Sequence, residues 1–239
     1  MKTPADFDEH RRQVLVKLLS MGAFALGSGA VSARLLGAVP NPLPAGQSVY
    51  SVEGDVRVNG KPVQTSTPIR ASDLVETGAN SSVIFVVGRD AFITRSNTKL
   101  QLAAAGAEEF VVGTLRLVTG KLLSVFGKST HSVQTATATI GIRGTGVYVE
   151  ADPDETYICT CYGTTELSAN DKPDATETIT SQHHDAPRYI LAKGDERIRP
   201  APFKNHTDAE LALIESLVGR TTPFELPGEA YGRPRRSTY

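Results

Sequence analysis

Hydrophobic and polar residues alternate with a period of two along most of the chain, from Gln47 to about Lys193. Successive side chains of a β-strand point to opposite faces, so this period predicts strands. One of the clearest runs covers 82–87, and Gly88-Arg89-Asp90 turns it into another run at 91–94. Asn59-Gly60 predicts a tight hairpin, because both residue types tolerate a positive φ. The pattern therefore indicates many short strands separated by turns.

No helical pattern of useful length interrupts this region, which argues against alternating strands and helices. We expect an all-β body, either a sandwich or a solenoid-like roll, because local pattern does not fix how strands pair. Exact repeats, which would favour a regular solenoid, are absent. One helix is predicted near the carboxyl terminus, where the sequence from Thr207 to Glu210 provides a cap and an acidic first turn. An apolar stripe follows, and Gly219 ends the helix.

The amino-terminal segment has the pattern of an export signal. Arg11-Arg12 precedes a mildly apolar run that ends in Val31-Ser32-Ala33, as in twin-arginine signal peptides. The alternative is a retained anchor helix in the inner membrane. Both put the following chain in the periplasm. We expect this organisation: 1–33, signal peptide or anchor; 34–46, proline-rich linker; 47–193, β domain; 194–239, carboxyl-terminal helix and tail.

Composition, charge and the absence of common catalytic motifs exclude several classes of function. The chain has 239 residues and a formal net charge of −1, so no overall basic field favours nucleic acid. No nucleophile elbow, phosphate-binding glycine loop or His-Glu-x-x-His motif is present. We therefore expect a protein that is not an enzyme and does not bind nucleic acid, with another protein as its partner.

Several motifs resemble the FecR domain, over about 46–169. The stretch 72–82 reads SDLVETGANSS, and Gly88-Arg89-Asp90 and 95–98 follow at the spacing of that family. The most specific part is a strand at 133–138 leading into GIRGTGVYV at 141–149. The resemblance implies a periplasmic β domain in which Arg143, Gly144 and Thr145 belong to the family motif. The motif's glycines permit turns that side chains would block, so its main role is expected to be architectural.

The better-known members of that family regulate iron-siderophore uptake from the inner membrane. They carry a cytoplasmic segment that binds a sigma factor. Few residues precede the apolar run at 18–33 here, so we expect that segment to be lacking. The resemblance therefore implies a signalling or interaction module, with a possible link to metal or iron regulation.

Cys159 and Cys161 are the only cysteines, two positions apart on a predicted strand. Their side chains share one face, where a disulfide is geometrically awkward but two thiolates would grip one metal ion. His183 and His184 lie within reach of one hairpin, and being adjacent on a strand they would face opposite ways. His131 and His206 are more distant candidates. A shell of sulfur and imidazole suits zinc or copper, and iron is also possible.

Two functions therefore remain open. The first is a non-enzymatic periplasmic FecR-domain protein that acts in signalling or protein interaction. The second is a periplasmic metal-binding or redox-responsive protein that uses Cys159, Cys161, His183 and His184. In a third interpretation the two cysteines are structural or unpaired thiols.

Overall fold

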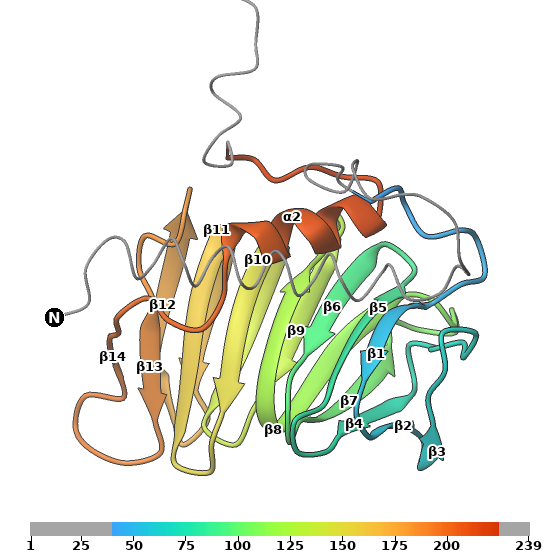
Figure 1. Ribbon diagram of the computed structural model, residues 1–239. Coiled ribbons are helices and arrows are strands. Elements are labelled where there is room, and N and C mark those ends of the chain that lie inside the picture. The colour runs from blue at the N-terminus through green and yellow to red at the C-terminus, as the bar shows by residue number, and fades with distance from the viewer. Residues whose placement is uncertain (1–39, 225–239) are drawn as a thin grey trace, which may run out of the picture.

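The computed structural model describes residues 40–224 (Figure 1). The predicted signal or anchor at 1–33 lies outside these residues. The strands are β1 (Val49–Glu53), β2 (Val56–Val58), β3 (Lys61–Pro62), β4 (Leu74–Thr77), β5 (Ser82–Val87), β6 (Asp90–Thr94), β7 (Lys99–Ala104), β8 (Val112–Val125), β9 (Thr130–Gln134), β10 (Ala138–Ala151), β11 (Glu155–Ala169), β12 (Lys172–Ser181), β13 (Arg188–Leu191) and β14 (Ile198–Pro200), and the helix is α2 (Asp208–Leu217). The expected all-β body with one carboxyl-terminal helix is confirmed.

Two of the predicted turns have the expected geometry. Val58 pairs with Lys61, and between them Asn59 and Gly60 both have positive φ, which confirms the hairpin at this dipeptide. Val87 pairs with Asp90 across the next predicted turn. Nearly all strand pairs are antiparallel, and β8 with β9 is the parallel pair among those of the described residues.

Three strands are much longer than the alternating pattern indicates. β8 and β10 each have 14 residues and β11 has 15. Their two halves pair with different neighbours: the first half of β8 pairs with β7 and β9, and the second half with β6 and β10. β10 and β11 divide in the same way. Each long strand therefore passes from one layer of the structure into another.

The sheet folds into two layers as a result. The helix-side layer has the order β1, β5, β6, second half of β8, second half of β10, first half of β11, β13, β14. The far layer has the order β3, β2, β4, β7, first half of β8, β9, first half of β10, second half of β11, β12. This is a sandwich, one of the two expected arrangements.

Glycines sit where the long strands bend. Gly120 of β8 has a φ of +95°, and a Cβ there would lie 2.3 Å from Thr98 Oγ1 and 2.4 Å from its Cα. Only glycine tolerates both this backbone shape and this approach. In β10 the register with β11 shifts between Arg143 and Gly146, and Gly144 in this bulge has a φ of +56°. Such bulges bend a strand.

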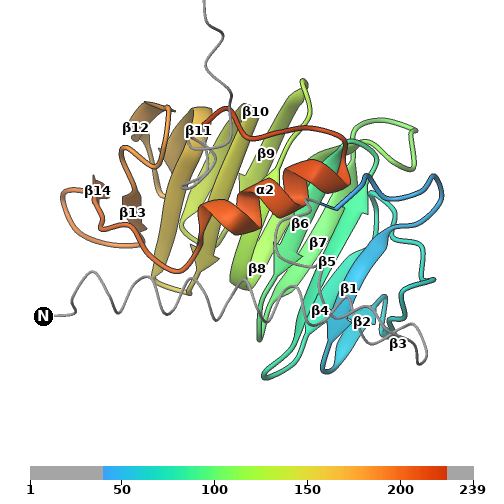
Figure 2. The ribbon, with the colours of Figure 1, turned by 45° about the horizontal axis from the view of Figure 1, so that its top comes forward.

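Two hydrophobic clusters hold the layers. The larger lies between them, with residues such as Phe85, Leu122 and Val149 from the helix-side layer and Leu115 and Ile140 from the far layer. The second cluster covers the outer surface of the helix-side layer. It contains alternate residues of its strands together with three apolar residues of α2: Leu211, Ile214 and Leu217. The helix lies across β10, β8 and β6 (Figures 1 and 2), so this face is buried although it is not part of the main core.

The helix begins as the sequence predicts. The Thr207 hydroxyl accepts a hydrogen bond from the Glu210 amide, and the Glu210 carboxylate accepts one from the Thr207 amide, a reciprocal cap. After Leu217, Gly219 takes a φ of +72°. The helix is ten residues long, and no helix within 40–224 is long and apolar enough to cross a membrane.

Candidate metal centre

The two cysteines lie on the face of β11 that α2 covers. Both are free thiols, and both side chains are fully buried. Ile158 and Thr160, their neighbours in the strand, point to the opposite side, as the alternation requires; Ile158 belongs to the core between the layers. The predicted parallel projection of the two thiols from one strand is therefore what the structure shows.

His184 reaches the thiols from the loop after β12. The Asp185 carboxylate accepts hydrogen bonds from the backbone amides of Gln182 and His183, which folds the loop tightly. The His184 amide donates to the Cys161 carbonyl oxygen at 2.9 Å, and His184 has a φ of +57°. A positive φ in a residue other than glycine is uncommon. It brings the Nδ1 atom of His184 to 3.4 Å from the Cys159 Sγ.

His206 arrives from the other side, on the residue just before the cap of α2. Its Nε2 lies 3.4 Å from the Cys161 Sγ and 3.2 Å from the His184 Nδ1. Its ring stacks on that of Tyr148 in β10, with centroids 4.5 Å apart and planes inclined by 20°. Because His206 immediately precedes Thr207, the docking of α2 on the sheet fixes where this imidazole lies.

The four donor atoms lie close enough together to bind one ion. They all lie within 4.8 Å of one another. Ordinary zinc bond lengths in a regular tetrahedron would separate two nitrogens by about 3.3 Å and a sulfur from a nitrogen by about 3.6 Å. The observed 3.2 Å between nitrogens and 3.4 Å for two sulfur–nitrogen pairs are close to these values. These three distances therefore match those of a zinc site.

Both imidazoles are also oriented by their second nitrogen. His184 Nε2 lies 2.9 Å from Asp208 Oδ1, and His206 Nδ1 lies 2.8 Å from the Lys204 carbonyl oxygen. With a proton on each of these nitrogens, the two nitrogens that face the thiols carry free lone pairs. Metal-binding histidines in proteins almost always have a carboxylate or carbonyl partner of this kind.

The neighbours of the two thiols shift their pKa values in opposite directions. A hydrogen bond from Cys161, together with those from His184 and His206, lowers the pKa of the Cys159 thiol to about 4 against the effect of burial. Burial and the neighbouring Cys159 raise the pKa of Cys161. Burial alone would lower the pKa of His184, but its bonds to Asp208 and Cys159 raise it to about 9. At neutral pH the cluster thus holds a thiolate beside an imidazolium, and a metal ion would replace protons on binding.

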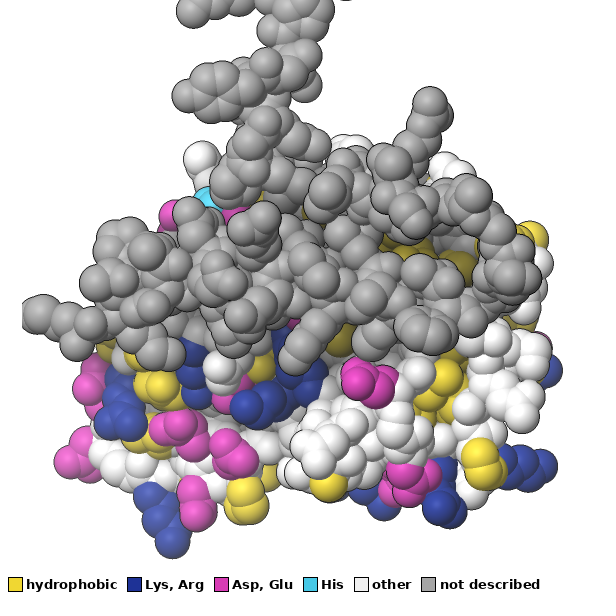
Figure 3. All heavy atoms as spheres, in the orientation of Figure 1, with side chains coloured by type: hydrophobic (Ala, Val, Ile, Leu, Met, Phe, Trp, Pro, Cys, Tyr) yellow, Lys and Arg dark blue, Asp and Glu magenta, His cyan; other side chains and the backbone are white. Residues whose placement is uncertain are grey.

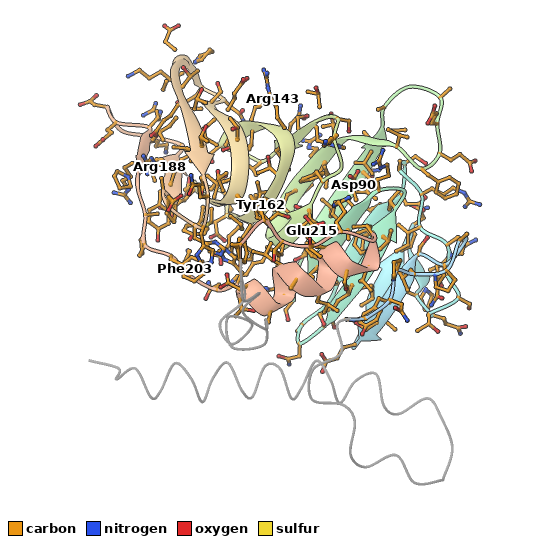
Figure 4. The ribbon with its side chains drawn as sticks, turned by 90° about the horizontal axis from the view of Figure 1, so that it is seen from above. Asp90, Arg143, Tyr162, Arg188, Phe203 and Glu215 are labelled. Carbon is orange, nitrogen blue, oxygen red and sulfur yellow. The ribbon has the colours of Figure 1, made fainter. Side chains whose placement is uncertain are left out.

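The centre is closed to solvent. Cys159 and Cys161 have no exposed surface, His206 is 3% exposed, and the His184 side chain is 9% exposed. Phe203 packs against both imidazoles on the outside, with ring centroids 4.7 Å from His184 and 4.6 Å from His206. Phe203 lies beyond the amino-terminal end of α2 (Figure 4). Four protein donors without an open position are typical of a structural metal site rather than a catalytic one.

The structure brings together three of the four residues expected as ligands. Cys159, Cys161 and His184 meet, whereas the His183 side chain lies outside, with Nε2 3.0 Å from Asp208 Oδ1. His206, expected only as a distant candidate, takes the fourth place. His131 lies elsewhere, buried beside Val112 and Ser129.

The residues that resemble the FecR motif lie in the bend of β10. Arg143 is exposed and forms an ion pair with Glu166 at 2.8 Å. The Thr145 hydroxyl donates to the Arg143 carbonyl oxygen at 2.7 Å, and Gly144 has the positive φ described above. These contacts stay within β10 and β11, on the opposite side of the bend from the thiols.

The chain matches no described protein family and no curated protein. Among solved structures, two crystal structures of a candidate anti-sigma factor from Parabacteroides distasonis ATCC 8503, at 1.65 and 2.50 Å resolution, each align with a TM-score of 0.44 and 8% identity. Each alignment covers 54% of this chain and 58% of the other, so the chain spans little more than half the length of the structures it matches. This likeness places the chain in no family.

Proposed function

We propose that this protein binds one zinc ion through Cys159, Cys161, His184 and His206. The observation that carries the proposal is the convergence of two thiols and two imidazole nitrogens within 4.8 Å of one another, with three of the separations close to those of a tetrahedral zinc shell. Burial of polar groups is costly unless they are bonded, and one ion would bond all four donors at once.

Zinc fits this donor set better than copper or iron. Two thiolates and two imidazoles in a tetrahedron are the shell of many structural zinc sites. Blue-copper sites use one thiolate with a weak axial ligand, and non-haem iron oxygenases use two histidines and a carboxylate with open positions. Two thiolates also neutralise the charge of a divalent ion, which suits a site with no exposed sulfur.

The role of the ion is to fasten the carboxyl-terminal segment to the sheet. Its ligands come from β11, from the loop after β12, and from the segment that leads into α2. The ion would therefore join three parts of the chain at the amino-terminal end of the helix. At the other end Glu215 accepts a hydrogen bond from Tyr162 and pairs with Arg220 (Figure 4 labels Tyr162 and Glu215).

We infer in addition a non-enzymatic, regulatory role in the periplasm, in which the β domain contacts a protein partner. The resemblance of 141–149 to the FecR signature and the export pattern at 11–33 support this role. A closed metal site agrees with it, since catalysis at zinc requires an open position. A metal that holds the helix in place would make the docking of α2 depend on metal supply.

Elemental analysis of protein purified without added metal tests the zinc proposal. We expect about one zinc per chain in the wild type and none in the Cys159→Ser, Cys161→Ser double variant. Gln182→Ala, an exposed residue beside the loop histidines, is the matched control and keeps the zinc. Metal-free wild-type protein that also fails to take up zinc during refolding would overturn the proposal.

A further inference from the structure

A second group of donor atoms lies directly outside the centre. His183 Nε2 is 3.0 Å from Asp208 Oδ1, and His184 Nε2 is 2.9 Å from the same oxygen. These three donors lie within 4.8 Å of one another. Imidazole nitrogens and a carboxylate oxygen are zinc ligands, although this outer set contains no sulfur. His184 is common to both groups: Nδ1 faces the thiols and Nε2 faces the outer set.

The two groups differ in their access to solvent. The His183 side chain is 48% exposed, that of Asp208 is 14% exposed and that of His184 is 9% exposed. The cysteines have no exposed surface at all. Figure 3 shows histidine atoms at the molecular surface beside acidic side chains. Exposure thus falls in steps from His183 to the thiols, so that among the described donors an ion from solution meets His183 first.

Hydrogen bonding alone does not require His183 here. His184 already provides the donor that Asp208 needs, and within the described residues the Asp208 carboxylate accepts no hydrogen bond from a backbone amide. The His183 ring is held in place on its other sides by rings, with centroids 4.8 Å from His184 and 4.4 Å from Phe224. An exposed imidazole is therefore held in a fixed position next to the buried centre.

We propose that His183, Asp208 and His184 form a capture site through which zinc reaches the buried centre. The ion binds first to His183 Nε2, to the Asp208 carboxylate and to His184 Nε2, and protons on these two nitrogens leave to solvent. It then moves to His184 Nδ1, His206 Nε2 and the two sulfurs; the protons of His184 Nδ1 and Cys161 leave to solvent, and His184 Nε2 takes up a proton again. The ion keeps its charge throughout, and apart from these proton transfers only bonds to the metal are made or broken. This proposal rests on the zinc centre proposed above.

A residue that the ion contacts only on its way to the centre affects rates, whereas a residue that supports the bound ion affects affinity. Uptake and release use the same route in opposite directions, so loss of the capture ligand slows both by the same factor and leaves the dissociation constant unchanged. Loss of a partner that merely orients a ligand weakens affinity instead, typically by about 10–100-fold. Comparison of the change in the uptake and release rates with the change in the dissociation constant therefore separates the two roles.

Cobalt(II) provides the direct readout, because its thiolate charge-transfer absorption develops only when the ion reaches Cys159 and Cys161. Stopped-flow mixing of metal-free, full-length protein with excess cobalt gives the uptake rate, and competition with a chelator gives the equilibrium affinity. The test variant is His183→Gln, whose amide keeps a hydrogen-bond donor for Asp208 but is a poor metal ligand. Gln182→Ala, exposed and adjacent, is the control.

We expect uptake and release to slow by about tenfold or more in His183→Gln, equal to a barrier increase of about 1.4 kcal/mol, with affinity within about twofold of the wild type. The control should match the wild type in both. Unchanged rates in His183→Gln, or weaker affinity with an unchanged uptake rate, would overturn the capture site while the zinc centre stands. If the wild type develops no thiolate absorption, both proposals fail.

Discussion

Replacement of Cys161 by serine removes one of the four donors with the smallest change of shape. The serine hydroxyl fits the space of the thiol but is a poor ligand for zinc at neutral pH. Cys161 is fully buried on β11 and its Sγ lies 3.4 Å from the His206 Nε2, the donor that precedes α2. The variant should therefore lose the stabilisation that zinc gives to the docked helix.

The size of that stabilisation follows from mass action. Zinc that binds only the folded protein, at a free concentration a hundred times the dissociation constant, raises the free energy of unfolding by about 2.7 kcal/mol. For a chain of this size each kcal/mol raises Tm by about 2–4 °C, so zinc should raise the wild-type Tm by about 5–11 °C. In Cys161→Ser we expect this increment to fall close to zero at the same zinc concentration.

Circular dichroism during heating, with and without zinc, measures the zinc-induced rise of Tm in the wild type and in Cys161→Ser. The buffer contains a reductant that is not a thiol. Thr160→Ser is the matched control, since Thr160 is the neighbour in the strand, points to the opposite face and bonds Thr165 through its hydroxyl at 2.7 Å. It keeps that hydroxyl and should keep the full zinc increment. An equal zinc-induced rise of Tm in Cys161→Ser and the wild type would refute the assigned ligand.

Three further substitutions test the orientation of His184, the cap of α2 and the bend of β8. Asp208→Asn removes the carboxylate that orients His184 and should weaken zinc binding by about 10–100-fold in a chelator competition; unchanged affinity would contradict its role. Thr207→Ala removes the cap of α2 and should lower the free energy of unfolding in urea by about 1 kcal/mol, whereas no loss would mean that the cap contributes nothing. Gly120→Ala combines a φ of +95° with a backbone contact at Thr98 and should cost at least about 2 kcal/mol. Its control, Gly60→Ala, has a positive φ but open space, and should cost less in the same denaturation measurement.

The sequence predicted the strands, the helix and its cap because these depend on local periods and on short turns. It did not predict the long strands, because a strand that bends between layers has the same alternation in each half. In addition, a glycine such as Gly120 is typical of a turn between two short strands. Pairing through both halves is a property of the folded sheet. For this reason the sequence could not decide between a sandwich and a solenoid-like roll.

The same distinction applies to the centre. The shared face of Cys159 and Cys161 follows from strand geometry, and His184 lies close in the sequence. The fourth donor, His206, is 45 residues from Cys161, and only the docking of α2 brings it near. One signal was present in the sequence: His206 directly precedes the cap of an amphipathic helix, and such a helix must cover an apolar face. In the structure, α2 covers the outer face of the helix-side layer, which carries the thiols.

The passage of β11 through both layers has a consequence for how the molecule unfolds. Its first half carries the thiols beneath α2, while its second half pairs with β12 in the far layer. The layers share three such strands, β8, β10 and β11. They therefore cannot unfold separately without breaking the hydrogen bonds along these strands. Hydrogen exchange should therefore find one cooperative unit, in which an event on the far layer changes the protection of amides at the thiols. The two faces of this protein are connected by covalent chain as well as by packing.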